Sequence, residues 1–165
     1  AKAYTGALNQ VVSDYLGFSV RLVKMPDFGR PISQDCADGY VSFADGLPYL
    51  LCNQQSLNDL NEKLNNPVTM LNFRPNIVVD GNQPFEEDDW DRIRIGEIEF
   101  INVKPCKRCV LTTVDPVTGV KAADAEPLKT LAAYRQPKPG EILFGINLVV
   151  EGLGQVRVGD EVEIM

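Results

Sequence analysis

The stretch Arg92-Ile-Arg-Ile-Gly-Glu-Ile-Glu-Phe-Ile-Asn-Val103 has a clear strand pattern. It reads as two strands joined at Gly96, because apolar side chains recur at every second position on either side of a turn residue. Toward the C-terminus, residues 142–151, 155–158 and 161–165 show further strand patterns. We predict that the last two form a short hairpin that closes a small barrel.

The rest of the chain is predicted to contain both helices and strands. Three helices are predicted, at residues 6–17, at 57–64 behind an N-cap at Ser56, and at about 127–134. Strands are expected at 18–24, 76–79 and 110–114, and a long loop at 25–40, while residues 49–52 form a short apolar segment. The acidic run 86–91 is expected to be a solvated loop, with Trp90 packed in the core. The prediction is a mixed α/β, mainly β fold: a β-barrel with about three peripheral helices, forming one domain over residues 1–165.

Composition excludes several functions. The chain has 165 residues, no histidine and a net charge of −7. Histidine-dependent catalysis and His-ligated zinc are therefore excluded. An acidic chain is a poor nucleic-acid binder, and no apolar run approaches the ~18 residues of a membrane span. Its four cysteines are too sparse for a disulfide scaffold, so we expect a reducing, cytoplasmic compartment.

Two local motifs carry potential chemistry. Lys104-Pro-Cys-Lys-Arg-Cys109 places two thiols among three cations, which favour the thiolate. A zinc site, a redox pair and two incidental cysteines remain open interpretations, although a strand after the motif disfavours a thioredoxin-like site. In Asn72-Phe-Arg-Pro-Asn76, Arg74 and Asn76 would face the same side of an extended strand. That pair suits an anionic or heterocyclic ligand, and a surface arginine paired with a carboxylate is the alternative.

Several motifs together resemble the MOSC domain family, in the branch of the mitochondrial amidoxime-reducing components and the bacterial YcbX-type proteins. They are Asn72-Phe-Arg-Pro-Asn-Ile-Val-Val79, Glu87-Asp-Asp-Trp90, Cys106-Lys-Arg-Cys-Val-Leu-Thr-Thr-Val-Asp-Pro-Val-Thr-Gly119 and Glu126-Pro-Leu-Lys-Thr-Leu131. The resemblance implies a MOSC-type β-barrel and a molybdenum cofactor, molybdopterin. It implies Cys109 as the catalytic thiolate ligand of molybdenum, and a cofactor-binding set of Arg74, Asn76, Asp45 and Arg108.

The implied activity is reduction of N-hydroxylated compounds such as amidoximes and hydroxylamines. Electrons would come from a ferredoxin-type or flavoprotein donor, with an iron–sulfur centre on a separate domain or protein. Relatives carry an N-terminal β-rich segment and, in some bacteria, a C-terminal ferredoxin domain. We therefore expect a fragment that is inactive by itself, from a parent enzyme.

Two other functions stay open. The family was first associated with pyridoxal-phosphate-dependent cysteine desulfurases, which makes a sulfur carrier with a persulfide on Cys109 the alternative. A plain thiol module, with Cys106 and Cys109 as a redox pair, is the other.

Overall fold

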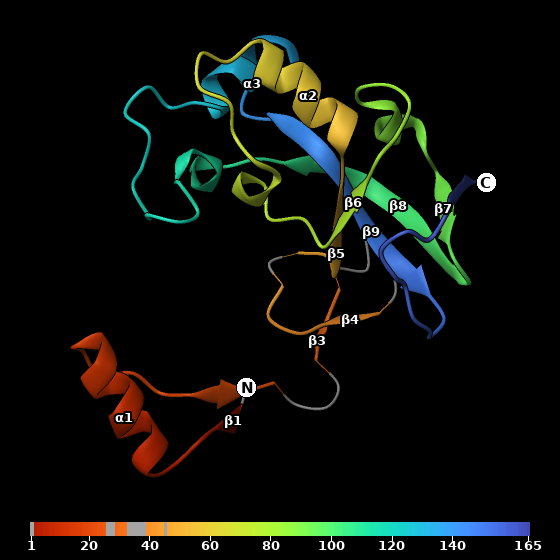
Figure 1. Cartoon of the computed structure of the whole chain (residues 1–165). Helices are drawn as coiled ribbons and strands as arrows, with labels where there is room; N and C mark the ends of the chain where they lie inside the picture. The colour runs from red at the N-terminus through yellow and green to blue at the C-terminus, as the bar shows by residue number, and fades with distance from the viewer. Residues whose placement is uncertain (1, 26–28, 33–38, 45) are drawn as a thin grey trace. The chain divides into compact units, whose positions relative to one another are not determined.

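A computed structural model describes residues 2–25, 29–32, 39–44 and 46–165. The chain divides into two compact units, Ala1–Gly46 and Leu47–Met165. Figure 1 traces the chain. Among the helices of the described residues, none combines the length and the apolar character that crossing a bilayer requires.

The first unit contains short elements. They are β1 (Lys2–Ala3), α1 (Ala7–Leu16), β2 (Val23–Lys24), β3 (Arg30–Pro31) and β4 (Tyr40–Val41), with β1 paired to β2 and β3 to β4. Of the strand expected at 18–24, only the last two residues form a strand. Side chains of α1 accept hydrogen bonds from backbone N–H groups in the preceding residues. Val20 N donates to Ser13 Oγ and Leu22 N donates to Asn9 Oδ1, both at 3.0 Å.

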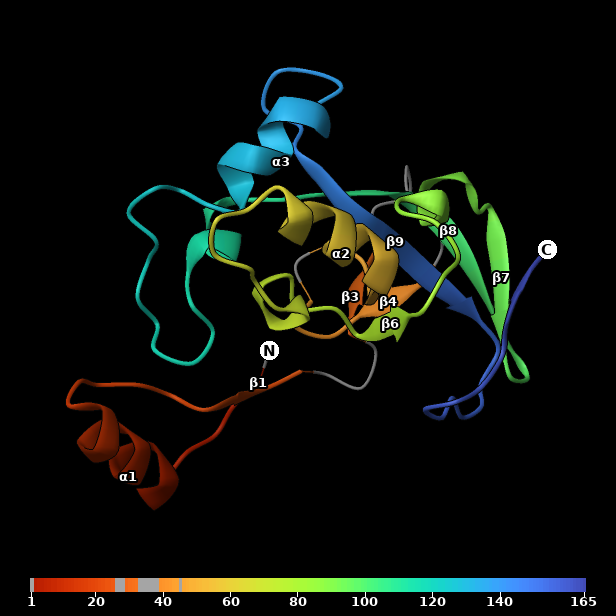
Figure 2. The ribbon, with the colours of Figure 1, turned by 45° about the horizontal axis from the view of Figure 1, so that its top comes forward.

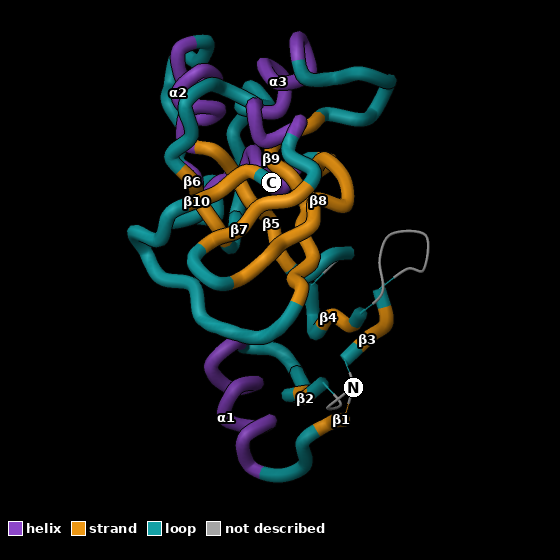
Figure 3. The backbone as a smooth tube through the Cα atoms, turned by 90° about the vertical axis from the view of Figure 1, so that its right-hand side faces the viewer, coloured by secondary structure: helices purple, strands orange, loops and turns teal. Residues whose placement is uncertain are grey.

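The second unit is a curled six-stranded mixed sheet, in the order β10-β7-β8-β9-β5-β6, covered by two helices. Its elements are β5 (Tyr49–Asn53), α2 (Gln54–Glu62), β6 (Ile77–Val79), β7 (Arg92–Ile95), β8 (Ile98–Lys107), α3 (Leu128–Tyr134), β9 (Leu143–Glu151) and β10 (Val162–Ile164). Only β5 and β6 pair in parallel, joined through α2. The sheet curls into a half-barrel (Figure 3). The predicted mixed α/β fold is confirmed.

The two faces of the sheet bury different side chains. Leu51 and Ile146 belong to a core on one face, with Trp90 buried there as predicted. Cys52 and Phe144 belong to a second core, against which α2 and α3 pack. Figure 2 shows these two helices together near the start of β9.

Gly145 makes this division possible. Side chains of a strand alternate between its faces, yet Phe144 and Ile146, two residues apart, lie in different cores. Gly145 has φ 72°, and the β8–β9 register shifts beside it, opposite Pro105–Lys107. A Cβ there would lie 2.5 Å from Leu51 O and 2.7 Å from Cys52 Sγ. The bulge therefore needs glycine.

Three short segments differ from their predictions. In the strand predicted at 110–114, the first four residues instead form a 3₁₀ helix, η3 (Val110–Thr113), because Thr113 Oγ1 donates to Val110 O at 2.7 Å and competes with a strand ladder. Residues 155–158 are no strand, because the Asp160 carboxylate accepts from Arg157 N at 2.7 Å and forms a local turn. The last strand, β10, pairs with β7 instead of forming a terminal hairpin.

The acidic run is only partly solvated. It contains a 3₁₀ helix, η2 (Glu86–Asp89), in which Glu87 is fully buried. Ser56 Oγ of α2 donates to its two carboxylate oxygens at 2.8 and 3.0 Å, and accepts from Phe85 N at 2.7 Å. Burial raises the pKa of the Glu87 carboxyl, and the Ser56 hydrogen bond opposes that shift. The hydrogen bonds between Glu87 and Ser56 thus connect η2 to α2.

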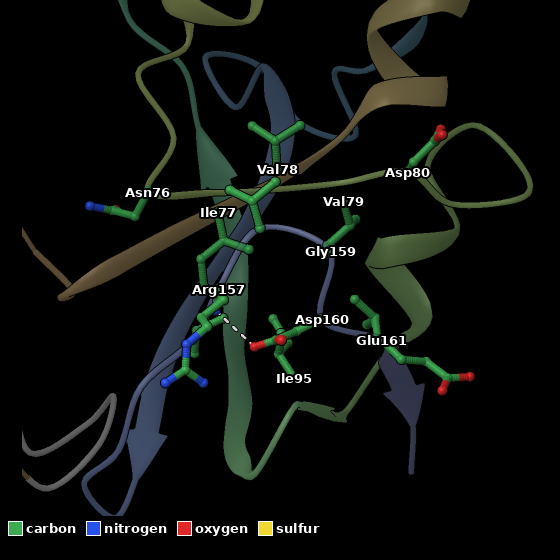
Figure 4. Close-up of a pocket in the computed structure, with 13 residues that line it drawn as sticks. Asn76, Ile77, Val78, Val79, Asp80, Ile95, Arg157, Gly159, Asp160 and Glu161 are labelled. Atoms are coloured by element: carbon green, nitrogen blue, oxygen red, sulfur yellow. Dashed lines mark hydrogen bonds between the residues drawn. The ribbon is translucent and has the colours of Figure 1, made fainter.

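A cavity of about 610 Å³ opens at the edge of the sheet (Figure 4). It lies between β6 and residues 156–162, with Ile77, Val79 and Ile95 among its apolar lining. Within the part of the chain that the structure describes, β6 pairs only with β5, and β10 only with β7. Both edges of the curled sheet therefore keep unpaired backbone groups.

Substitution of Gly145 tests the bulge. Gly145→Ala should lower the free energy of unfolding by about 2–5 kcal/mol, because a left-handed conformation is combined with a close backbone approach. Gly119 is a matched control, with φ 71° and no atom within 4 Å of the place that a Cβ would take. Gly119→Ala should cost only about 1–2 kcal/mol in a urea denaturation experiment. Equal losses for the two variants would contradict the steric explanation.

The Glu87 network predicts a pH-dependent effect. Because the pKa of Glu87 is raised in the folded protein, its buried charge destabilises the fold above that pKa, and the penalty disappears as pH falls. Glu87→Gln should therefore gain melting temperature relative to wild type as pH rises from about 4 to about 8. Glu97→Gln, at an exposed position, is the control. A difference between Glu87→Gln and wild type that stays constant with pH would refute this prediction.

Candidate functional site

The Arg74 and Cys109 loops lie side by side in the second unit. Arg74 follows the 3₁₀ helix η1 (Met70–Asn72), and Cys109 precedes η3. Asn72 Nδ2 donates to Thr112 O at 3.3 Å, and Arg108 Nη2 donates to Phe73 O at 2.6 Å. These two hydrogen bonds hold the loops together although about 35 residues of chain separate them.

Arg74 is exposed and has φ 57°, in the left-handed region. Its backbone N donates to Met70 O and Leu71 O, both at 3.2 Å. The premise that Arg74 and Asn76 share one face of an extended strand is therefore wrong, because Arg74 ends a helical turn and β6 begins later. Among the described residues, the Arg74 side chain has no carboxylate partner, so the alternative of a paired surface arginine does not hold there.

Asn76 has a structural task. Its Oδ1 accepts from Leu50 N at 2.8 Å, and its backbone N donates to Leu50 O at 2.9 Å, which extends the β5–β6 pairing. Only the Nδ2 group is left to donate to a ligand. Asn76 also lines the cavity at the sheet edge, and Figure 4 shows its amide directed away from the other lining side chains.

The three described cysteines are free thiols in three environments. Cys109 is exposed, and its carbonyl accepts from Thr112 N and Thr112 Oγ1 at 3.1 and 3.0 Å. Cys106 is half-buried and accepts from Arg108 Nη1 at 3.0 Å. Cys52 is buried, and desolvation raises the pKa of its thiol to about 12, with the Arg108 charge opposing. Cys109 is thus the most accessible of these thiols.

The partners that Arg108 contacts could not be predicted from the sequence. Its guanidinium lies 5.4 Å from the Phe73 ring centroid, and its backbone N donates to Ile142 O at 2.7 Å. Phe73 is fully buried and stacks on Phe144 at 3.9 Å. No local pattern predicts these partners. Asp45, the remaining predicted site residue, lies outside the described residues.

A metal site built from several protein side chains has no support in the described ranges. They contain no cluster of three or more His, Cys, Asp or Glu residues able to hold a metal. A metal whose other ligands come from an organic cofactor needs only one soft protein ligand, and the Cys109 thiol fits that requirement. The exposed Arg74 fits an anionic group of such a cofactor.

Residues 38–163 match the family model of the MOSC domain. The chain therefore belongs to the MOSC domain family, as the motifs predict. It is 42% identical over 149 residues to mitochondrial amidoxime-reducing component 1 of Homo sapiens, covering 86% of this chain and 42% of the relative. It is 47% identical over 129 residues to mitochondrial amidoxime reducing component 2 of Macaca fascicularis, covering 74% and 38%. The chain spans about two fifths of the length of these relatives.

The predicted cytoplasmic location is wrong on this comparison. The relatives are named mitochondrial components, which points to mitochondria. The prediction rested on the small number of cysteines, which does not distinguish the cytoplasm from another reducing compartment.

The thiol environments predict an order of reactivity. Iodoacetamide at about pH 8 should modify Cys109 in the folded protein, whereas Cys52 stays unmodified, because a thiol with a pKa of about 12 is ionised to only about one part in 10⁴ there. Peptide mapping by mass spectrometry measures both residues. Guanidinium-unfolded protein is the control, in which Cys52 should react readily. Equal rates in the folded protein would be inconsistent with the buried position of Cys52.

Proposed function

We propose that this chain is the molybdenum cofactor-binding part of an oxidoreductase that reduces N-hydroxylated compounds such as amidoximes and hydroxylamines. Support comes from membership of the MOSC family and from relatives named amidoxime-reducing components. The observation that carries the proposal is the pairing of two loops. One presents the exposed Cys109 thiol, and the other presents the exposed Arg74 cation.

Each side chain has a task in this proposal. The Cys109 thiolate would bind molybdenum, because a soft sulfur ligand suits a soft metal site. Arg74 would bind the phosphate group of molybdopterin through its planar set of donors. Asn76 would contribute its free Nδ2 group, since its Oδ1 is engaged by Leu50.

When bound, the cofactor supplies the two-electron chemistry that removes the hydroxyl oxygen of the substrate. The electrons are proposed to come from a ferredoxin-type or flavoprotein donor. The chain has no histidine, so we propose that water supplies the protons. The protein then holds the cofactor and positions the substrate beside it.

A sulfur carrier is the second candidate. The same exposed Cys109 thiol that would bind a metal would also hold a persulfide. The two functions make different demands on Arg74, because a persulfide needs no phosphate-binding cation.

Metal content tests the proposal. The chain, and the longest natural protein that contains it, would be produced in a host that synthesises the cofactor. Near-stoichiometric molybdenum is expected, falling to background in Cys109→Ser, because the thiolate ligand is lost. Arg74→Ala should lower cofactor retention by roughly tenfold, the value of a charge-assisted hydrogen bond. Elemental mass spectrometry measures the metal.

The matched control is Arg94→Ala. Arg94 lies on β7, is partly exposed and pairs with Glu163 at 3.3 Å. It should leave the metal content unchanged. The proposal is refuted if the chain and the longer natural protein both fold and neither contains molybdenum. An added sulfur atom on Cys109 would then favour the carrier function.

A further inference from the structure

Arg108 uses its guanidinium inside the protein. Nη1 donates to Cys106 Sγ at 3.0 Å and Nη2 donates to Phe73 O at 2.6 Å. Its Nε is buried without a hydrogen-bond partner in the described residues. Two of its five N–H donors are therefore bonded within the protein and a third is enclosed, so the guanidinium is fixed against the neighbouring loop.

The carbonyl that Arg108 holds belongs to the peptide group between Phe73 and Arg74. The other end of that peptide group, Arg74 N, donates to Met70 O and Leu71 O at 3.2 Å. The orientation of this group sets φ of Arg74, which is 57°. A residue other than glycine rarely adopts this conformation without support from its surroundings.

We propose that Arg108 is the positioning residue of Arg74. It holds the Phe73–Arg74 peptide group against Cys106, so that Arg74 keeps its left-handed conformation and presents its side chain to the ligand. The identity of that ligand rests on the proposed function, whereas the positioning is a property of this chain. Both arginines were expected from the resemblance to bind the cofactor. In this proposal Arg74 binds the ligand and Arg108 holds Arg74 in position.

Arg108→Lys separates charge from geometry. Lysine keeps the positive charge, but its single ammonium group cannot reproduce the planar fork that bridges two acceptors. The backbone ¹³Cα and ¹³Cβ shifts of Arg74 should move away from left-handed values. The alkylation rate of Cys106 should change by about fivefold or more, because a charged hydrogen bond to its sulfur is lost. Arg94→Lys, at a partly exposed position on β7, is the control and should change neither value.

Pyrophosphate serves as the anion probe, and its binding is followed by ³¹P NMR, which can be measured for every variant, including Arg74→Ala. Wild type should bind it, and Arg108→Lys should bind about tenfold more weakly although Arg74 is intact. If wild type and Arg74→Ala bind it equally while Arg74 still shifts in Arg108→Lys, the positioning stands and the proposed anion site fails.

The positioning role is overturned if folded Arg108→Lys keeps the Arg74 shifts and the Cys106 alkylation rate of wild type. If that variant does not fold, Cys106→Ala gives the answer. It removes one acceptor of Arg108 at a half-buried position and should move the Arg74 shifts in the same direction by a smaller amount. Unchanged Arg74 shifts in folded Cys106→Ala would equally overturn the proposal.

Discussion

The close approach of β9 to β5 at Gly145 is the constraint on which the second unit depends. The left-handed glycine lets the β9 backbone pass Leu51 O and Cys52 Sγ, and it exchanges the faces of the residues on either side. Phe144 consequently turns toward the helices and stacks on Phe73. Phe73 in turn supplies the carbonyl that Arg108 holds, next to Cys109. The left-handed conformation of Gly145 thus influences the candidate site through the stacked pair of Phe144 and Phe73.

The sequence predicts best what depends on neighbouring residues. Strands β7, β8 and β9 follow the alternation of apolar side chains, which is a local signal. The segment after Cys109 differs from its predicted strand because the Thr112 and Thr113 hydroxyls bond to the preceding turn, where β-branched residues otherwise favour a strand. The burial of Glu87 depends on Ser56, 31 residues away, and charge alone predicts solvation.

The site shows the same limit. Motifs identify Cys109, Arg74 and Asn76 as residues of interest, and the structure places the Arg74 and Cys109 loops together. It also changes what the residues can do. Asn76 uses its carbonyl oxygen in the sheet, and Arg108 uses its guanidinium on the neighbouring loop. Spacing in the sequence gives no information on such long-range hydrogen bonds, because the partners of a long polar side chain are set by the fold.

The half-barrel leaves β6 and β10 with one unpaired edge each among the described residues. Val78 on β6 and Ile164 on β10 are exposed beside those edges. Unpaired backbone donors and acceptors next to β-branched side chains are a template for another strand, and soluble proteins usually cover such edges or place charges on them. Each edge strand is only three residues long, and β10 carries the charged Glu163, so a strand of another chain would find few backbone groups to pair with there.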